Sequence, residues 1–186
     1  MSAGNSDMHS GGRVVLRTGY GSATTSGSLY VATADSAAAN GVSGYMVFST
    51  GTAAKGNSGS MLLGSGTSTS GRGGLLSVTV GSGDSGAGGD MILTAGGTSD
   101  SIATSTGGQV HLSAGTAASQ TGGRVWIRTG VSSATTSGAL GMVTADSAAG
   151  GVSGYVVLST GASTKGNTGA MYAGSGTSTS GRGGSL

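Results

Sequence analysis

The sequence predicts an all-β protein, a parallel β-solenoid (β-helix) with about 15 residues per coil and roughly twelve coils. Two observations support this prediction: glycines recur at a nearly constant spacing, and apolar residues alternate with other residues after each glycine. The first such stretch, residues 12–19, reads GRVVLRTG, and closely similar stretches occupy residues 44–51 and 123–130. A repeat of this kind indicates one short structural unit per period, stacked on its neighbours.

The glycine that opens each stretch is called the marker glycine. The marker glycines are Gly12, Gly27, Gly44, Gly59, Gly74, Gly89, Gly108, Gly123, Gly138, Gly154, Gly169 and Gly184. Most steps between them are 15 residues, and the steps of 17, 19 and 16 residues begin at Gly27, Gly89 and Gly138. The additional residues are expected to bulge from turns, at 35–40, 98–106 and 146–150.

A longer period lies above the short one, because residues 12–38 match 123–149 and residues 41–74 match 151–184. The predicted organisation is a single solenoid over residues 1–186. Its long-period units are 11–121 and 122–186, the second incomplete, and residues 1–10 end a preceding coil. Both ends fall within a repeat, so we expect a window on a longer array.

The second and fourth residues after each marker glycine are nearly all apolar, as in Val14 and Leu16 or Met46 and Phe48. Successive side chains of a strand point to opposite faces, so these pairs are predicted to face a narrow interior. Glycine at this density excludes helix, at a cost of about 1 kcal/mol for each glycine relative to alanine. The rest of each repeat, such as 21–26 or 68–73, is predicted to form two turns and a second short strand. Its charged residues Lys55, Arg72, Lys165 and Arg182 are predicted to face outward.

An antiparallel repeat sandwich is the alternative fold. It is disfavoured because its loops would span seven or eight residues, whereas tight hairpins prefer two.

The face opposite to the interior is also rich in apolar and aromatic residues. A strand that is apolar on both faces is normally buried on both, and an exposed apolar stripe marks an interaction surface. The predicted interface consists of Val15, Tyr30, Tyr45, Val47, Leu62, Ile92, Trp126, Tyr155, Val157 and Tyr172, together with Arg13, Arg17, Arg124 and Arg128. The arginines could bind a carboxylate, a sulfated glycan or a neighbouring subunit, or they could simply cover an aromatic ring while solvated.

Composition excludes several partners. The net charge is +2, only 8% of the residues are charged, and nothing forms a basic patch interleaved with aromatics, so no nucleic-acid partner is expected. There is no cysteine, hence neither a disulfide nor a thiolate metal site. No apolar run approaches the roughly 18 residues of a membrane helix, so membrane insertion is not expected.

The motifs that suggest chemistry are weak. Residues 83–86, Gly-Asp-Ser-Gly, resemble the nucleophile motif of trypsin-like proteases, but only His9 and His111 could act as a base. A turn explains the motif better. The remaining acidic residues considered are Asp35, Asp84, Asp90, Asp100 and Asp146. Aspartate in turns usually accepts local hydrogen bonds, so no catalytic, cofactor or metal site is predicted.

The pattern Gly-x-Φ-x-Φ-x-Thr-Gly, in which Φ is apolar, occurs at 12–19 and 154–161. It resembles the Gly/Ser/Thr-rich tandem repeats of extracellular β-solenoid adhesins and fibre proteins, and the likeness covers essentially the whole chain. It implies an extracellular or cell-surface location and a fibre or surface-stalk role. The function expected is therefore structural and non-enzymatic, with the coils stacking end to end and associating laterally with further copies through the outward face.

The alternative function is an ice-binding or glycan-binding solenoid, with ice or a surface polysaccharide as its partner. A column of threonines raises the question of ice binding: Thr18, Thr33, Thr50, Thr129, Thr144 and Thr160. These threonines share the inward parity of the apolar pairs. The outward face carries Arg, Lys, Tyr and Trp, which would spoil a flat ice-binding array.

Overall fold

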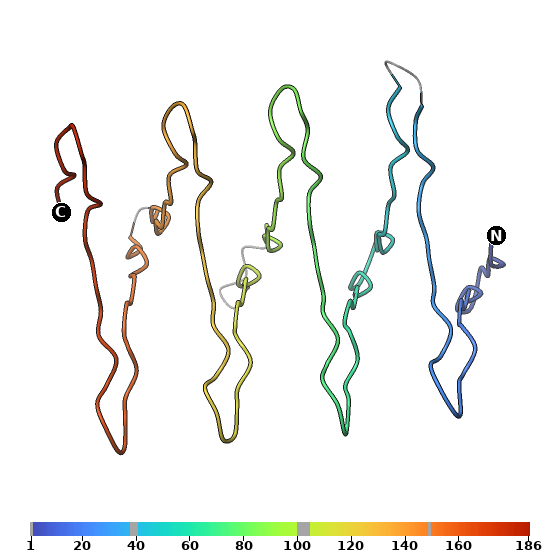
Figure 1. Ribbon diagram of the computed structural model, residues 1–186. Coiled ribbons are helices and arrows are strands. Elements are labelled where there is room, and N and C mark those ends of the chain that lie inside the picture. The colour runs from blue at the N-terminus through green and yellow to red at the C-terminus, as the bar shows by residue number, and fades with distance from the viewer. Residues whose placement is uncertain (1, 38–40, 100–104, 149) are drawn as a thin grey trace. The chain divides into compact units, whose positions relative to one another are not determined.

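The computed structural model describes residues 2–37, 41–99, 105–148 and 150–186. None of these residues lies in a helix or a strand, and Figure 1 accordingly draws the chain as a plain trace. The predicted parallel β-solenoid is therefore wrong, and so are its roughly twelve coils. The described residues form no antiparallel sandwich either. In this part of the chain, no helix has the length and apolar character needed to cross a membrane.

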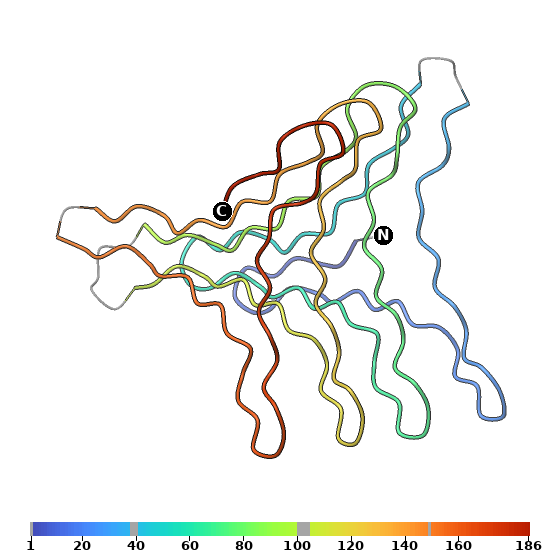
Figure 2. The same ribbon diagram turned by 60° about the vertical axis from the view of Figure 1, so that its left-hand side comes forward.

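The chain divides into two compact units, Met1–Met91 and Ile92–Leu186. Each unit alternates between two kinds of structure. The first kind, the extended segments, follows the marker glycines: residues 12–18, 27–33, 44–50, 59–65 and 74–80 in the first unit, and 108–114, 123–129, 138–144, 154–160 and 169–175 in the second. The second kind is the loop between one segment and the next, in which the chain goes out and returns (Figure 2).

Each loop is closed where the marker glycine that follows it meets the residue that precedes it. We call this closure a neck. At the neck of the loop between 12–18 and 27–33, the Gly27 amide donates a hydrogen bond to the Gly19 carbonyl over 3.1 Å. The equivalent neck in the second unit has the same bond, from Gly138 to Gly130, also 3.1 Å long.

Close approach of the backbone favours glycine at most of the necks. A Cβ built on Gly12 would lie 3.0 Å from the Ala3 Cβ and 3.0 Å from the Gly4 amide nitrogen. A Cβ on Gly89 would lie 2.7 Å from Val80 Cγ1. A Cβ on each marker glycine would meet the residue before the loop within 4 Å, and most of these contacts are tight, although the one at Gly169 is an ordinary contact of 3.6 Å. The predicted glycine period therefore corresponds to a recurring structural feature, which is a loop closure and not the first residue of a strand.

The loops also take up the additional residues of the longer repeats. In most repeats the marker glycine meets the residue nine positions earlier, as Gly59 meets Thr50. At Gly44, Gly108 and Gly154 the partners are Thr33, Ala95 and Thr144, which lie 11, 13 and 10 positions earlier. The described residues of the insertions predicted at 35–40, 98–106 and 146–150 therefore lie within closed loops, and residues 38–40, 100–104 and 149 are outside the described residues.

The middle of most loops is a bend, and no described residue of any loop lies in a second strand. The loop stretches 21–26 and 68–73, which were predicted to hold short strands, instead bend at 22–24 and 69–71. Lys55 and Lys165 lie on the corresponding bends at 54–56 and 164–166. Gly56 and Gly166 supply the positive φ angles that these two bends need, 108° and 115°.

The physical reason for the failed prediction lies in these loops. A β-ladder forms only when neighbouring segments lie about 4.8 Å apart along their lengths. Here the chain between two segments closes on itself at a neck. These residues do not continue as a second side of a solenoid coil, as the prediction required. The backbone groups of residues 13–17 make no hydrogen bond to another described residue, and no described side chain is buried.

Candidate association surface

The residues predicted to form the interface are all open to solvent. The ten apolar and aromatic members are exposed by between 63% at Val15 and 93% at Tyr172, and Trp126 is exposed by 74%. The four arginines, two beside Val15 and two beside Trp126, are exposed as well. The structure therefore leaves this set available to a partner.

The residues predicted to face the interior are also exposed, which corrects the sequence interpretation. Val14 is exposed by 49% and Leu16 by 63%, where both were expected to be buried. A weak difference between the faces does persist. In each segment whose third residue is apolar, that residue is more exposed than the second, as Val15 is more exposed than Val14. The apolar surface thus runs over both faces of the segments.

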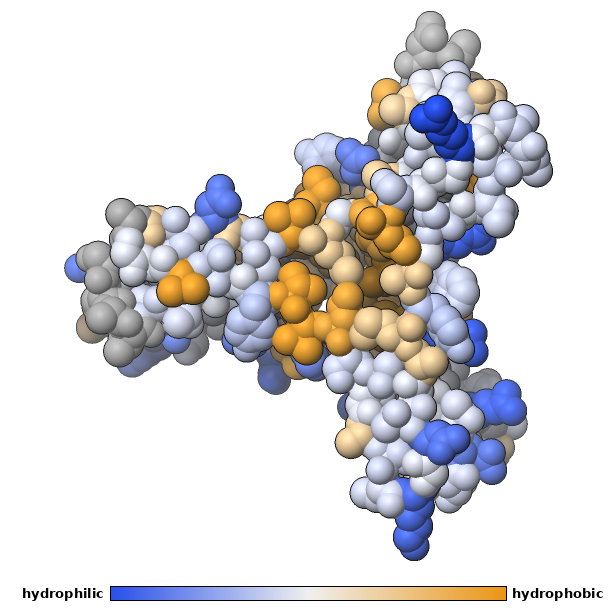
Figure 3. Space-filling model, turned by 90° about the vertical axis from the view of Figure 1, so that its left-hand side faces the viewer, coloured by the Kyte–Doolittle hydropathy of each residue, from blue (hydrophilic) through white to orange (hydrophobic). Residues whose placement is uncertain are grey.

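Figure 3 shows the consequence for the molecular surface. On the face drawn there, apolar atoms gather and lie open, and the hydrophilic atoms lie around them, most of them farther out. The polar atoms of the loops and the apolar atoms of the segments are separated along the sequence as well, because the bends hold Ser, Thr, Asp and Lys. An exposed apolar surface of this extent is typical of an interaction surface.

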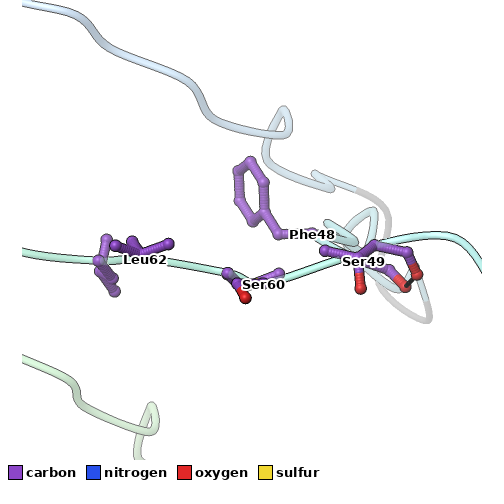
Figure 4. A pocket seen from close by; sticks show the side chains of 7 residues that line it. Phe48, Ser49, Ser60 and Leu62 are labelled. Carbon is purple, nitrogen blue, oxygen red and sulfur yellow. Dashed lines mark hydrogen bonds between the residues drawn. The ribbon is translucent and has the colours of Figure 1, made fainter. Parts of the chain in front are cut away.

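An open notch lies in the first unit, between the segments 44–50 and 59–65. Its volume is about 510 Å³. Figure 4 shows Phe48 and Ser49 on one segment and Ser60 and Leu62 on the next. The notch is lined by Phe48, Ser49, Thr50, Ser60, Met61, Leu62 and Leu63.

One of the three polar side chains that line this notch is satisfied within its own segment. The Ser49 hydroxyl donates to the Thr50 carbonyl over 3.0 Å. The interior surface is therefore left to Phe48 and to the consecutive apolar residues Met61, Leu62 and Leu63. The notch offers dispersion contacts and apolar burial, and it brings no acid, base or nucleophile other than serine and threonine hydroxyls.

The loops carry their own local hydrogen bonds. In the loop 130–137, the Ser132 hydroxyl accepts from the Ala134 amide over 3.3 Å and from the Thr135 amide over 2.9 Å. In a loop near the C-terminal end, Ser178 Oγ accepts from the Gly181 amide over 2.8 Å. In these bends a serine hydroxyl, in place of water, accepts hydrogen bonds from backbone amides, as in a serine–threonine turn.

The stretch Gly83-Asp84-Ser85-Gly86 is one of these bends, at 84–86, and Gly86 has a φ of 76°. This is the turn that the sequence indicated. Among the described residues, no three of His, Cys, Asp or Glu come together in a way that could hold a metal ion. Asp100 is outside the described residues.

Sequence reasoning missed the partners of the marker glycines. They are Ala3, Thr18, Thr33, Thr50, Ser65, Val80, Ala95, Ala114, Thr129, Thr144, Thr160 and Ser175. All are small or β-branched, and several are among the few described residues that are not fully exposed. The available signal was the offset between a small residue and the next marker glycine, which is nine residues in every repeat except the three with insertions. The threonine column belongs to the necks.

No protein-family model matches this chain, and no curated protein or solved structure is significantly similar to it.

Proposed function

We propose that this chain is a structural, non-enzymatic protein whose function depends on association with further copies of itself, as in a fibre or a surface stalk. One observation carries the proposal: the extended segments are apolar on both faces, and both faces are exposed. The resemblance to the repeats of extracellular adhesins and fibre proteins supports an extracellular or cell-surface setting. The proposal does not require the single chain to form a solenoid.

The energetics favour association. Burying a side chain of the size of Val, Leu, Ile, Phe or Met stabilises a protein by roughly 1.5–3 kcal/mol. Ordering the backbone costs on the order of 1–2 kcal/mol for each residue. A single copy buries none of its described apolar side chains, so it has nothing to offset the cost of ordering its segments. Contacts between copies can supply that burial.

The backbone of the segments supports the same conclusion. Unpaired amides and carbonyls of an extended stretch are a template for pairing with another chain. In residues 13–17, these groups make no hydrogen bond to another described residue. Two copies that pair along such stretches would satisfy the backbone and cover apolar side chains at the same time.

Sedimentation velocity over a hundredfold range of concentration tests the proposal, with negative-stain microscopy to show the product. We expect species larger than 17.3 kDa that form elongated particles of uniform width. The double variant Trp126→Ser and Tyr155→Ser should weaken association about tenfold or more, because it removes two large exposed aromatics from the segments.

The matched control is Val131→Ser with Val152→Ser. These two valines are as exposed as the aromatics, but they lie in loops of the same unit. The control should associate as the unmodified chain does. A chain that stays monomeric at every concentration would contradict the proposal, and dispersed monomers with thermal hysteresis would favour ice binding in its place.

A further inference from the structure

The exposed area of this chain sets the scale of the association. Surface-area scaling gives a folded protein of 17.3 kDa about 7,800 Å² of accessible surface, and its unfolded chain about 25,100 Å². This chain exposes 18515 Å². The excess over an ordinary folded protein is about 10,700 Å².

An excess of this size cannot be covered by one patch. A standard interface covers about 800 Å² of each partner, and an interface between two domains of one chain buries about 600–1,500 Å² in total. Packing the two units against each other, or docking one partner on one face, would therefore leave most of the excess exposed. The covering partner must contact the chain along its whole length.

From this excess we infer that copies of the chain interleave, with extended segments of one copy inserted between consecutive extended segments of another. This inference rests on the proposed function and specifies how the copies meet. The partner must present short apolar stretches at intervals set by closed loops. Another copy presents apolar stretches at these intervals, because its marker glycines have the same spacing.

The notch at Phe48 offers room for such an insertion in the first unit. Its volume of about 510 Å³ is more than three times the roughly 150 Å³ cavity that accommodates a benzene ring. It therefore has room for several apolar side chains of one inserted segment. Because Phe48 and Met61 come from consecutive segments, an inserted stretch would contact both at once.

The loops limit how far the copies can interpenetrate. Their bends carry polar residues and the cations Lys55 and Lys165, which are costly to bury without a partner. The necks hold the ends of adjacent segments together, so the inserted stretch is bounded by the length of one segment. Interleaving therefore predicts protected segments and exposed loops, in alternation and in both units.

The absence of cysteine makes a thiol-accessibility experiment straightforward. Single Ser→Cys substitutions introduce one thiol each with little change in size. Three probes lie in segments of the two units: Ser60→Cys, Ser77→Cys and Ser159→Cys. Three matched probes lie in loops: Ser22→Cys, Ser85→Cys and Ser163→Cys. Each associated variant is treated with a thiol reagent, in buffer and in denaturant.

We expect the three segment thiols to react at least tenfold more slowly in the assembly than in denaturant. The three loop thiols should react within about threefold of their rates in denaturant. Protection of only one segment probe would indicate a single docking patch and would overturn interleaving. Equal rates at all six positions in an associated protein would also overturn it.

Subunit exchange gives a second readout that does not depend on any substitution near the segments. Two populations carrying different fluorophores on Ser22→Cys are assembled separately and then mixed. Interleaved copies should exchange no faster than they unfold, and should mix fully after joint refolding from denaturant. Free exchange within minutes in buffer would contradict interleaving. Sedimentation of the same samples separates this failure from a failure to associate, which would overturn the proposed function as well.

Discussion

The extended segment 12–18 and the loop 19–26 that follows it have opposite physical characters. The segment carries Val14, Val15 and Leu16, all exposed, and the backbone of its middle five residues is unpaired within the described chain. The loop carries no Val, Leu or Ile and is closed by the hydrogen bond between Gly27 and Gly19. The loop is thus stabilised by contacts between residues close in sequence, whereas the segment has no comparable contact to another described residue.

The second unit repeats this difference with nearly the same geometry. Its loop 130–137 is closed by the bond from the Gly138 amide to the Gly130 carbonyl, which is 3.1 Å long like the bond from Gly27 to Gly19, and at the preceding neck the Gly123 amide donates to the Gly115 carbonyl over 2.8 Å. Two loops of related sequence therefore adopt the same closure independently. Local sequence therefore determines the loops, whereas the proposed function has contacts between copies determine the state of the segments.

The largest effect is expected from charge placed in a segment. Val14→Asp with Leu16→Asp should weaken association at least a hundredfold in sedimentation, because each carboxylate would lose its hydration when a partner covers it. A hundredfold change corresponds to about 2.7 kcal/mol. Ser22→Asp with Thr24→Asp adds the same charge to the neighbouring bend and should change association less than threefold. Similar losses from both pairs would show that net charge, and not the segment, controls association.

A smaller effect is expected at the necks. A Cβ on Gly123 would lie 3.0 Å from the Gly115 amide nitrogen and 3.2 Å from its carbonyl oxygen, both backbone atoms that a side-chain movement cannot relieve. Gly123→Ala should therefore cost about 1–3 kcal/mol of neck stability. The measurement is amide hydrogen exchange at residue 123, which should become about tenfold faster.

Gly130→Ala is the matched control for this substitution. Gly130 has no atom within 4 Å of an added Cβ and no positive φ angle, and alanine there restricts mainly the unfolded chain. It should leave exchange at Gly123 unchanged and stabilise its own region by about 0.4–1 kcal/mol. Equal acceleration in the two variants would mean that the neck contact does not require glycine.

These contrasts explain what the sequence could predict. The period of the marker glycines and the position of the insertions follow from local spacing, and both have a counterpart in the necks. The turn at 83–86 was identified for the same reason. Each of these features is decided by residues fewer than about fifteen positions apart.

The absence of strands from the described residues could not be predicted in the same way. The alternation of apolar residues at Val14 and Leu16 indicates that these side chains favour burial. It does not indicate whether the same chain or another chain buries them. The notch was likewise invisible. It depends on Phe48 and Leu63, whereas the matching positions of the second unit hold the smaller residues Leu158 and Ala173. Such differences in size are lost when repeats are compared by polarity alone.

A further prediction concerns the bend of the loop 130–137. Ser132→Ala removes the acceptor of the Ala134 and Thr135 amides and should cost about 0.5–1.5 kcal/mol. Exchange at the Thr135 amide should become about two- to tenfold faster. Ser133→Ala, on the same bend, is the control and should leave that amide unchanged. Unchanged exchange in the first variant would show that solvent replaces Ser132 without loss.

The smallest effect is expected where the two units differ. Gly21 stands at the position that Ser132 occupies in the second unit, and a Cβ on Gly21 would collide with the Thr25 carbonyl. Gly21→Ser must therefore shift the loop, and the second unit shows a bend that accepts serine at this position. We expect a stability change below about 0.5 kcal/mol, because the new hydrogen bonds offset the shift. Exchange at the Thr24 amide should slow toward the rate of Thr135, while Gly19→Ser should leave it unchanged. Faster exchange at the Gly27 amide in Gly21→Ser would instead show that the neck had opened, and that the closure of this loop depends on glycine at both positions.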